Sequence, residues 1–382
     1  MRTIDLSTRH FPVPHPPSLC DDNGKELTSL EVSVTSLFHH YWASKYSSEP
    51  SLSMQFEYAS QITSGPDWRM GGSGIGVDKE AKRNVSNELG KAFARWFMAT
   101  HFGHAYFCPF ETAMRRGANT VGHSWKRRSP GDLPDYICGK DDADINLLEA
   151  KGRYKSVSFD NKEFQVFRDQ INRAMLCDAS GSEISVKGFI SAARWATEGN
   201  PGVKSKLLVE DPWTEGRRVD SYPGDIGKSM VMGHYASVFR RLQMPVVADC
   251  LEYGYQFDSS YQGEQIGIWR CVTGPLEGVE FAGGLLGGGL SHDYCDGYRG
   301  HHGYQCRKDK FYLFSPSYFY GLELRLFVSL IKNLKYGESI RNMLEPILPP
   351  ENLGALSLLR DASVLGPGSY FELMNIENLS EI

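Results

Sequence analysis

Two carboxylates and a lysine occur together in residues 131–152, GDLPDYICGKDDADINLLEAKG. Asp135 follows a proline, and Glu149 and Lys151 flank Ala150 at the end of a short apolar run. Successive side chains of a strand point to opposite faces, so an extended 145–151 segment places Glu149 and Lys151 on one face. Two carboxylates beside an ammonium group could hold a hard divalent cation and its bound water.

A β-hairpin would bring Asp135 to the other two side chains. Residues 139–142, GKDD, have the composition of a tight turn, and strands are expected to start near Leu133 and Ile145. The register of such a hairpin can place Asp135 opposite the Glu149 end. The alternative is an edge strand that ends in an exposed Glu/Lys pair.

The flanking segments predict a regular succession of elements. Asp78 is a candidate N-cap for a helix with an apolar stripe that runs from Val85 to Phe97, and residues 104–110 suit a strand. A further helix is expected at 160–175, where Asp160 and Glu163 could form a capping box, and a strand is expected at 184–192. The predicted order is helix, three strands, helix, strand.

Pro134-Asp135 followed by Glu149-Ala150-Lys151 resembles the PD-(D/E)xK signature of the restriction-endonuclease-like nucleases. The predicted succession of elements is also the core order of that fold, and the resemblance covers roughly residues 78–192. It implies an α/β protein with an αβββαβ core, a mixed central sheet, an N-terminal helical arm and a C-terminal α+β extension. The expected regions are an arm and helical segment at 1–77, a nuclease core at 78–200 and a C-terminal region at 201–382.

The resemblance also implies roles for individual residues. Asp135 and Glu149 would be metal ligands, the backbone carbonyl of Ala150 a third ligand, and Glu88 on the preceding helix a further candidate. Lys151 would orient or deprotonate the attacking water and offset phosphate charge. The expected cofactor is Mg²⁺, which keeps several waters and needs few protein ligands, and Mn²⁺ could replace it.

Basic residues near the motif are candidates for contacts with nucleic-acid phosphates, which position a substrate without reading its sequence. A solvated face is the alternative explanation for them. Gln170 is a further candidate for a phosphate or for a metal-bound water, although the helix that carries it lacks the Gln-x-x-x-Tyr pattern of the RecB-like nucleases. The basic candidates are Arg153, Lys155, Lys126, Arg127 and Arg128.

These features favour a metal-dependent nuclease, with DNA as the preferred substrate. One alternative is a catalytically inactive binding module on the same fold, which the intact Asp135, Glu149 and Lys151 speak against. The other is an RNA-directed nuclease, which no residue excludes. The region 201–382 is expected to set target choice, to bind a protein partner or to form a homodimer.

Two histidine-containing segments invite a metal-binding interpretation. The spacing of His292, Cys295, His302 and Cys306 could hold a structural zinc ion, but no standard zinc module has this form, so a long irregular loop is expected. Residues 27–46 predict a helix, on which the adjacent His39 and His40 cannot share a face and are expected at the surface or its boundary. Two C-terminal helices are expected at 318–334 and 336–348.

Composition limits the class of protein. The 382 residues carry a formal net charge of -5, so contact with nucleic acid requires local basic patches. The eight cysteines form no CxxC pair, which favours reduced thiols in a cytoplasmic protein. No apolar run reaches the length of a transmembrane helix, so no membrane association is expected.

Overall fold

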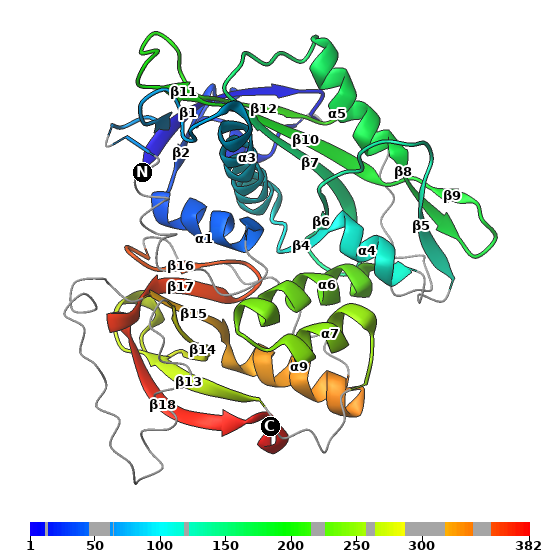
Figure 1. Ribbon diagram of the computed structural model, residues 1–382, viewed down its shortest axis with the longest axis vertical. Coiled ribbons are helices and arrows are strands. Elements are labelled where there is room, and N and C mark those ends of the chain that lie inside the picture. The colour runs from blue at the N-terminus through cyan, green and yellow to red at the C-terminus, as the bar shows by residue number, and fades with distance from the viewer. Residues whose placement is uncertain are drawn as a thin grey trace.

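The computed structural model describes residues 1–11, 14–45, 62–63, 65–117, 122–214, 226–256, 264–286, 318–338 and 353–382. Within these residues the protein is a mixed α/β structure with seven α-helices and sheets of seven, six, three and two strands (Figure 1). The α/β class and the mixed central sheet predicted from the sequence are confirmed at this level.

The largest sheet has seven strands in the order β2-β1-β12-β10-β7-β6-β4. The β7/β10 and β1/β12 pairs are parallel and the remaining neighbours are antiparallel. Its strands come from all three predicted regions of the chain. They are β1 (Arg2–Arg9), β2 (Ser29–Val32), β4 (Tyr106–Pro109), β6 (Tyr136–Gly139), β7 (Asn146–Arg153), β10 (Lys187–Arg194) and β12 (Lys206–Glu210).

Helix α3 (Lys79–Phe102) packs on β7 and runs across the large sheet (Figure 1). The predicted N-cap is confirmed, because the Asp78 side chain accepts hydrogen bonds from the first backbone amides of the helix. Gly103, with a φ of 73°, ends the helix in the left-handed conformation that glycine adopts without strain.

Helix α5 (Lys162–Arg173) packs on the opposite face of β7 and β10. A Cβ atom at Gly152 would meet the Ser86 carbonyl of α3, whereas one at Gly188 would meet Ile171 of α5. The helix begins one residue later than predicted, because Asn161 rather than Asp160 is the N-cap and accepts from the Phe164 amide at 2.8 Å.

The N-terminal region differs from the predicted helical arm. The 27–46 segment is divided into strand β2 and helix α1 (Val34–Lys45). Leu30 and Val32 are buried while their neighbours Ser29 and Glu31 are exposed, and this alternation of period two is that of a half-buried strand. The prediction of a single helix was therefore wrong.

The prediction that His39 and His40 lie at the surface was also wrong. Helix α1 packs between α3 and β16, so more than one of its sides is covered. His39 is 0% exposed, with its ring nitrogens 3.1 Å from Ser357 Oγ and 3.3 Å from Ser363 Oγ. His40 is buried as well.

A six-stranded antiparallel sheet, in the order β16-β17-β15-β14-β13-β18, lies in the C-terminal region. The helix predicted at 318–334 starts later than expected, because residues 318–323 form a strand paired on both sides and Glu323 then caps α9. Residues 339–348 of the second predicted helix lie outside the described residues. The strands are β13 (Gln265–Cys271), β14 (Glu280–Leu286), β15 (Tyr318–Glu323), β16 (Ser357–Leu358), β17 (Ser363–Pro367) and β18 (Phe371–Asn378).

The remaining helices are α4 (Phe110–Gly117), α6 (Ile226–Arg241), α7 (Pro245–Tyr253) and α9 (Leu324–Tyr336). A three-stranded sheet of β5 (His123–Arg127), β8 (Ala174–Asp178) and β9 (Glu183–Ile184) projects from the large sheet, and β3 (Arg69–Met70) pairs with β11 (Ala196–Thr197). The single-turn 3-10 helices are η1 (Pro17–Leu19), η3 (Gly274–Leu276), η5 (Gly368–Tyr370) and η6 (Leu379–Glu381).

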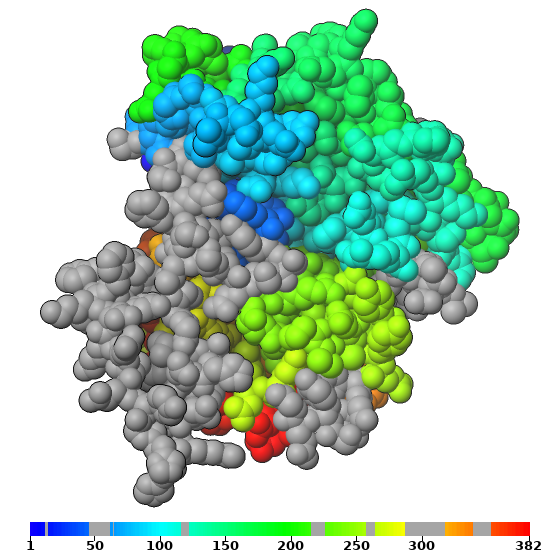
Figure 2. All heavy atoms as spheres, viewed as in Figure 1, coloured from blue at the N-terminus to red at the C-terminus, as the bar shows by residue number. Residues whose placement is uncertain are grey.

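One apolar core connects the two large sheets. Trp42 of α1 contacts Tyr320 of β15 at a ring distance of 5.4 Å, and α6 packs on β4. In the space-filling view α6 and α7 lie directly against the residues around 100–140 (Figure 2). The C-terminal region therefore contributes side chains next to the hairpin that carries the sequence motif. Among the described helices, none combines the length and the apolarity needed to span a bilayer.

Candidate active site

Strands β6 and β7 form the predicted hairpin. Tyr136 pairs with Leu148 in antiparallel register, and the same register continued by one residue sets Asp135 opposite Glu149. The Ala150 amide donates to Asp135 Oδ2 at 3.0 Å, and Lys151 Nζ lies 3.8 Å from the same oxygen. Lys151 Nζ also forms an ion pair with Glu149 Oε1. The three residues predicted to be catalytic are thus brought together.

Glu149 is a buried carboxyl group, 0% exposed. Lys151 is its ion-pair partner, yet within the described residues neither carboxyl oxygen receives a hydrogen bond of good geometry. Burial raises the pKa of Glu149 to about 8, and the neighbouring Asp135 charge acts in the same direction while Lys151 opposes it. Lys151 therefore compensates only in part for the burial of this carboxyl group.

Lys151 remains an ammonium group at neutral pH. Burial on its own lowers the pKa of this lysine, but the charges of Glu149 and Asp135 outweigh burial, and the net shift is upward. Its Nζ lies 5.8 Å from the centre of the Phe167 ring of α5, so the helix after the motif helps to place it. In this state Lys151 is suited to orienting a water molecule and to offsetting phosphate charge.

Lys91 is a site residue that the sequence interpretation missed. It extends from α3, and its Nζ lies 2.8 Å from Asp135 Oδ1. Burial lowers the pKa of Lys91, but Asp135, Tyr136 and Glu149 together raise it more, so this lysine is also an ammonium group. One feature of the sequence could have indicated Lys91 as a site residue. It follows the candidate Glu88 by three positions, and residues with this spacing share a helix face.

The donor set at the hairpin fits a magnesium ion with several water ligands. Within the described part of the chain, no cluster of three or more His, Cys, Asp or Glu side chains is positioned to bind a metal. A cation here would have the carboxylates of Asp135 and Glu149, the carbonyl of Ala150 and water, which is the sparse protein ligation that Mg²⁺ accepts. Glu149 Oε2, which has no hydrogen-bond donor among the described residues, is the observation that favours this fit.

Glu88 lies on α3 but has its partners on α1. Its Oε2 is 3.0 Å from Lys45 Nζ and accepts from the Tyr41 hydroxyl at 3.3 Å. The structure therefore places this proposed metal ligand in an ion pair between two helices, and none of its contacts to described residues reaches Asp135 or Glu149.

The basic residues predicted to bind phosphates are spread over two elements. Arg153, at the end of β7, forms an ion pair with Glu163, and Lys155 is exposed. Lys126 and Arg127 are exposed on β5, and Arg127 donates to the Gly131 carbonyl at 2.7 Å.

Arg128 follows β5 and is joined to the rest of the protein by two contacts. It donates to the Asn172 carbonyl at 3.1 Å and forms an ion pair with Glu183 of β9. Among the candidate cations, Lys126 and Lys155 have no ion pair with any described residue.

Gln170 has a different environment from the one predicted. Its side chain is 4% exposed, and Nε2 donates to the carbonyl of Leu133 at 3.4 Å. A buried amide held by this backbone group does not face a solvent-borne phosphate. It instead braces the segment that leads to Pro134 and Asp135.

The residues considered for a zinc site, His292, Cys295, His302 and Cys306, lie outside the described residues. Comparison of the chain with protein-family models, with curated proteins and with solved structures produced no match.

Proposed function

We propose that the protein is a metal-dependent nuclease that hydrolyses phosphodiester bonds, with DNA as its main substrate. The observation that carries the proposal is the convergence of Asp135, Glu149 and Lys151 at one end of the β6/β7 hairpin. The succession α3, β4, β6, β7, α5, β10 supports the αβββαβ arrangement of the restriction-endonuclease-like fold, with helix α4 and strands β5, β8 and β9 as additions outside the main sheet.

The proposed chemistry follows from the carboxylates, the backbone amide and the lysines at the site. A bound magnesium ion would acidify a coordinated water and stabilise charge on the phosphate oxygens. Asp135 and Glu149 would hold that ion, and the amide of Ala150 fixes the orientation of the Asp135 carboxylate. Lys151 would orient the attacking water and, with Lys91 on the other side of Asp135, offset the negative charge of the phosphate.

The test is incubation of the purified protein with supercoiled plasmid, linear duplex DNA and RNA, each with and without an excess of magnesium. Cleavage of DNA only in the presence of magnesium is expected. Cleavage of RNA alone would transfer the proposal to an RNA-directed nuclease. Absence of cleavage under all conditions would leave the chain without the proposed activity.

A pair of lysine variants makes this test specific. Lys151→Ala removes the ammonium group next to both carboxylates and should abolish cleavage. Lys140→Ala removes an exposed lysine from the turn of the same hairpin and should cleave as the parent does. If the two variants were equally active, the assignment of Lys151 would be wrong.

A further inference from the structure

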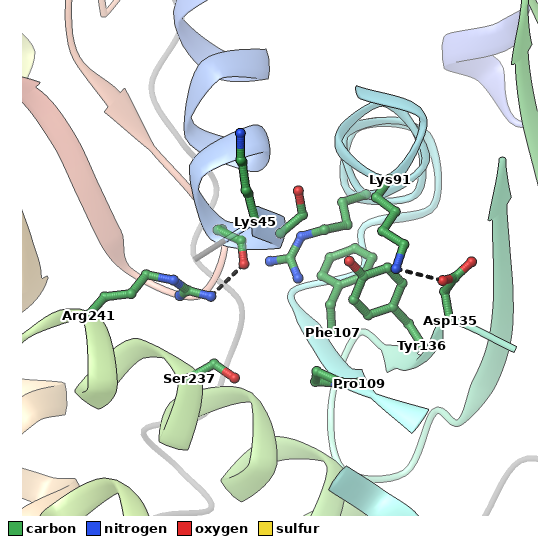
Figure 3. A pocket seen from close by; sticks show the side chains of 11 residues that line it. Lys45, Lys91, Phe107, Pro109, Asp135, Tyr136, Ser237 and Arg241 are labelled. Atoms are coloured by element: carbon green, nitrogen blue, oxygen red, sulfur yellow. Dashed lines mark hydrogen bonds and ion pairs between the residues drawn. The ribbon is translucent and has the colours of Figure 1, made fainter. Parts of the chain in front are cut away.

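A small cavity lies beside Asp135, between α1, α3, the β4/β6 strands and α6 (Figure 3). Its volume is about 220 Å³. Asp135 is the only carboxylate among its described lining residues, while four cationic side chains line it. These are Lys45, Lys91, Arg95 and Arg241.

Carboxylates neutralise part of this positive charge. Lys91 pairs with Asp135, and Lys45 pairs with Glu88 at 3.0 Å. Arg241, which is buried on α6, donates to the Ala43 carbonyl at the end of α1. The lining therefore carries more positive than negative charge.

Arg95 is the side chain that most needs an anion. It is 3% exposed, and its Nε atom has no hydrogen-bond partner among the described residues. The charge of Asp361 acts on Arg95, but that carboxylate forms its ion pair with His234. It lies over the ring of Phe107, 4.6 Å from the centroid, and over Tyr136 at 5.6 Å. Aromatic faces attract a cation, but a buried charge without hydrogen bonds remains costly.

We infer that this cavity binds the terminal phosphate of a nucleic-acid strand. A guanidinium presents paired donors that match phosphate oxygens, and Lys91, Arg241 and the Tyr136 phenol lie around the same space. The floor formed by Arg95 and Arg241 is buried, which suits a group with no continuation on its far side.

The position of the cavity ties it to the candidate active site. Asp135 lines the cavity, and its two oxygens face different lysines, Oδ1 toward Lys91 and Oδ2 toward Lys151. A strand end held by Arg95 would therefore run past Asp135 and present a nearby phosphodiester bond to it. The inference that the cavity holds a strand end rests on the proposed nuclease function, whereas anion binding by the cavity does not.

The first experiment measures thermal unfolding of the full chain without divalent cations, in inorganic phosphate and in chloride of equal ionic strength. Phosphate binding to the folded state should raise the melting temperature by about 3 °C when phosphate is ~100-fold above its dissociation constant. Arg95→Gln should lose this increase. Arg325→Gln, which changes an 85% exposed arginine on α9, should keep it.

A second variant covers the case in which Arg95→Gln does not fold. Ser237 of α6 lines the cavity, so Ser237→Asp places a carboxylate beside the arginines. This variant should melt at a higher temperature than the parent in chloride and should show no further increase in phosphate. A parent that shows no phosphate-dependent shift, or a Ser237→Asp protein with the same shift as the parent, would overturn the inference.

The second experiment distinguishes a phosphate at a strand end from free phosphate. It also distinguishes the nuclease proposal from the inference about the cavity. Duplex oligonucleotides with a 5′-phosphate, a 3′-phosphate or neither are cleaved in magnesium, and one phosphorylated form should be cleaved at least ~10-fold faster, corresponding to the ~1.4 kcal/mol of one charge-assisted contact. Arg95→Gln should remove that preference. If phosphate stabilises the protein but no DNA is cleaved, the nuclease proposal and the binding of a strand end are both refuted, and only anion binding by the cavity is supported. If DNA is cleaved at a rate that does not depend on end phosphates, only the binding of a strand end is refuted.

Discussion

Two effects act in opposite directions on the ionisation of Glu149. The hairpin buries its carboxyl group completely, which favours the neutral form, and Lys151 attracts the ionised form. Structural carboxylates in protein interiors usually receive several hydrogen bonds, but here the described residues provide only the ion pair with Lys151. Such an arrangement is costly for stability, and we propose that a cation held by Glu149 offsets this cost.

Glu149→Gln tests that explanation. The substitution keeps the shape of the side chain and removes the charge, so cleavage in magnesium should fall at least ~100-fold, because metal-assisted charge stabilisation is worth several kcal/mol. Thermal unfolding in EDTA should change little, since burial already favours the neutral form of Glu149, with a pKa of about 8, and Lys151 keeps Asp135 as a partner. A large loss of stability with cleavage retained would make Glu149 a structural residue.

The prediction of site residues succeeded where these residues are close together in the sequence. Asp135, Glu149 and Lys151 lie on two strands joined by a short turn, so alternation and a hairpin register were enough to bring them together. Lys91 and Arg95 lie on helix α3, and Arg241 lies on helix α6, which is distant in the sequence but lines the same cavity. Their convergence depends on how helices pack, which no local pattern specifies.

Gln170 has a positioning role that can be separated from folding. Gln170→Leu removes the hydrogen bond to the Leu133 carbonyl and lets the segment before Asp135 move. We expect kcat to fall about 10-fold with KM nearly unchanged, and stability to fall by about 1 kcal/mol, the net value of one hydrogen bond. Steady-state kinetics together with urea unfolding would show this, and a change in KM alone would instead indicate a direct substrate contact.

At the scale of elements, helix α3 packs closely on strand β7. Ser86 Oγ donates to the Gly152 carbonyl at 2.8 Å, and Trp195 Nε1 donates to the Ser86 carbonyl at 3.1 Å. A Cβ atom at Gly152 would lie 1.7 Å from the Ser86 carbonyl oxygen, and one at Gly90 would lie 2.6 Å from the backbone of residues 151 and 152. The two glycines allow α3 to approach β7, and this approach sets the reach of Lys91.

Gly152→Ala should therefore push α3 away from the strand. Overpacking of this kind costs about 1–3 kcal/mol of unfolding free energy, and displacement of Lys91 from Asp135 should lower activity as well. Gly202→Ala is the matched control, because a Cβ atom at that position meets nothing within 4 Å. Urea unfolding of both variants checks the prediction, and equal stability of the two would contradict the described packing.

Element prediction worked best for long amphipathic segments and failed at boundaries. Helix α3 has an apolar stripe and a capping aspartate, and both were recognised. Strands β2 and β15 directly precede helices, and their few apolar residues also fit a helical face, so each pair was predicted as one helix. Strand β8 follows α5 without a turn and was missed for the same reason.

At the scale of the whole molecule, the continuous core buries several histidines. Burial lowers the pKa of His39 to about 3 and the pKa values of His101 and His104 to about 4 each. In the unfolded chain these groups titrate near 6.5. Between about pH 6.5 and 4 the unfolded state therefore binds more protons than the folded state, and stability falls as the pH is lowered.

The three imidazoles together should give a loss of up to about 4 kcal/mol per pH unit in that interval, and Glu149, whose pKa is raised to about 8 in the folded state, should offset about 1.4 kcal/mol per pH unit of this loss. Urea midpoints measured at pH 7.5, 6.5 and 5.5 should be nearly equal at the first two values and clearly lower at the third. His104→Asn should make the acid loss shallower by about 1.4 kcal/mol per pH unit. A midpoint that is constant down to pH 5 would contradict the described burial.

The large-scale arrangement was the least predictable part of the protein. The N-terminal strand β1 pairs with β12, which is far from it in sequence, and α6 packs on β4. These contacts are set by complementary surfaces rather than by periodicity. They also supply the cationic wall beside Asp135, so the proposed strand-end pocket became visible only in the folded chain.

The central claim is that Asp135, Glu149 and Lys151 form a magnesium-dependent phosphodiesterase site. The most direct measurement is the rate of plasmid cleavage as a function of magnesium concentration for the parent protein, Asp135→Asn and Asp132→Asn. Asp132 is exposed three residues before the site and serves as the control. We predict saturable, magnesium-dependent cleavage by the parent and by Asp132→Asn, and none by Asp135→Asn. Cleavage by Asp135→Asn at the parental rate, or cleavage that does not depend on magnesium, would contradict the account.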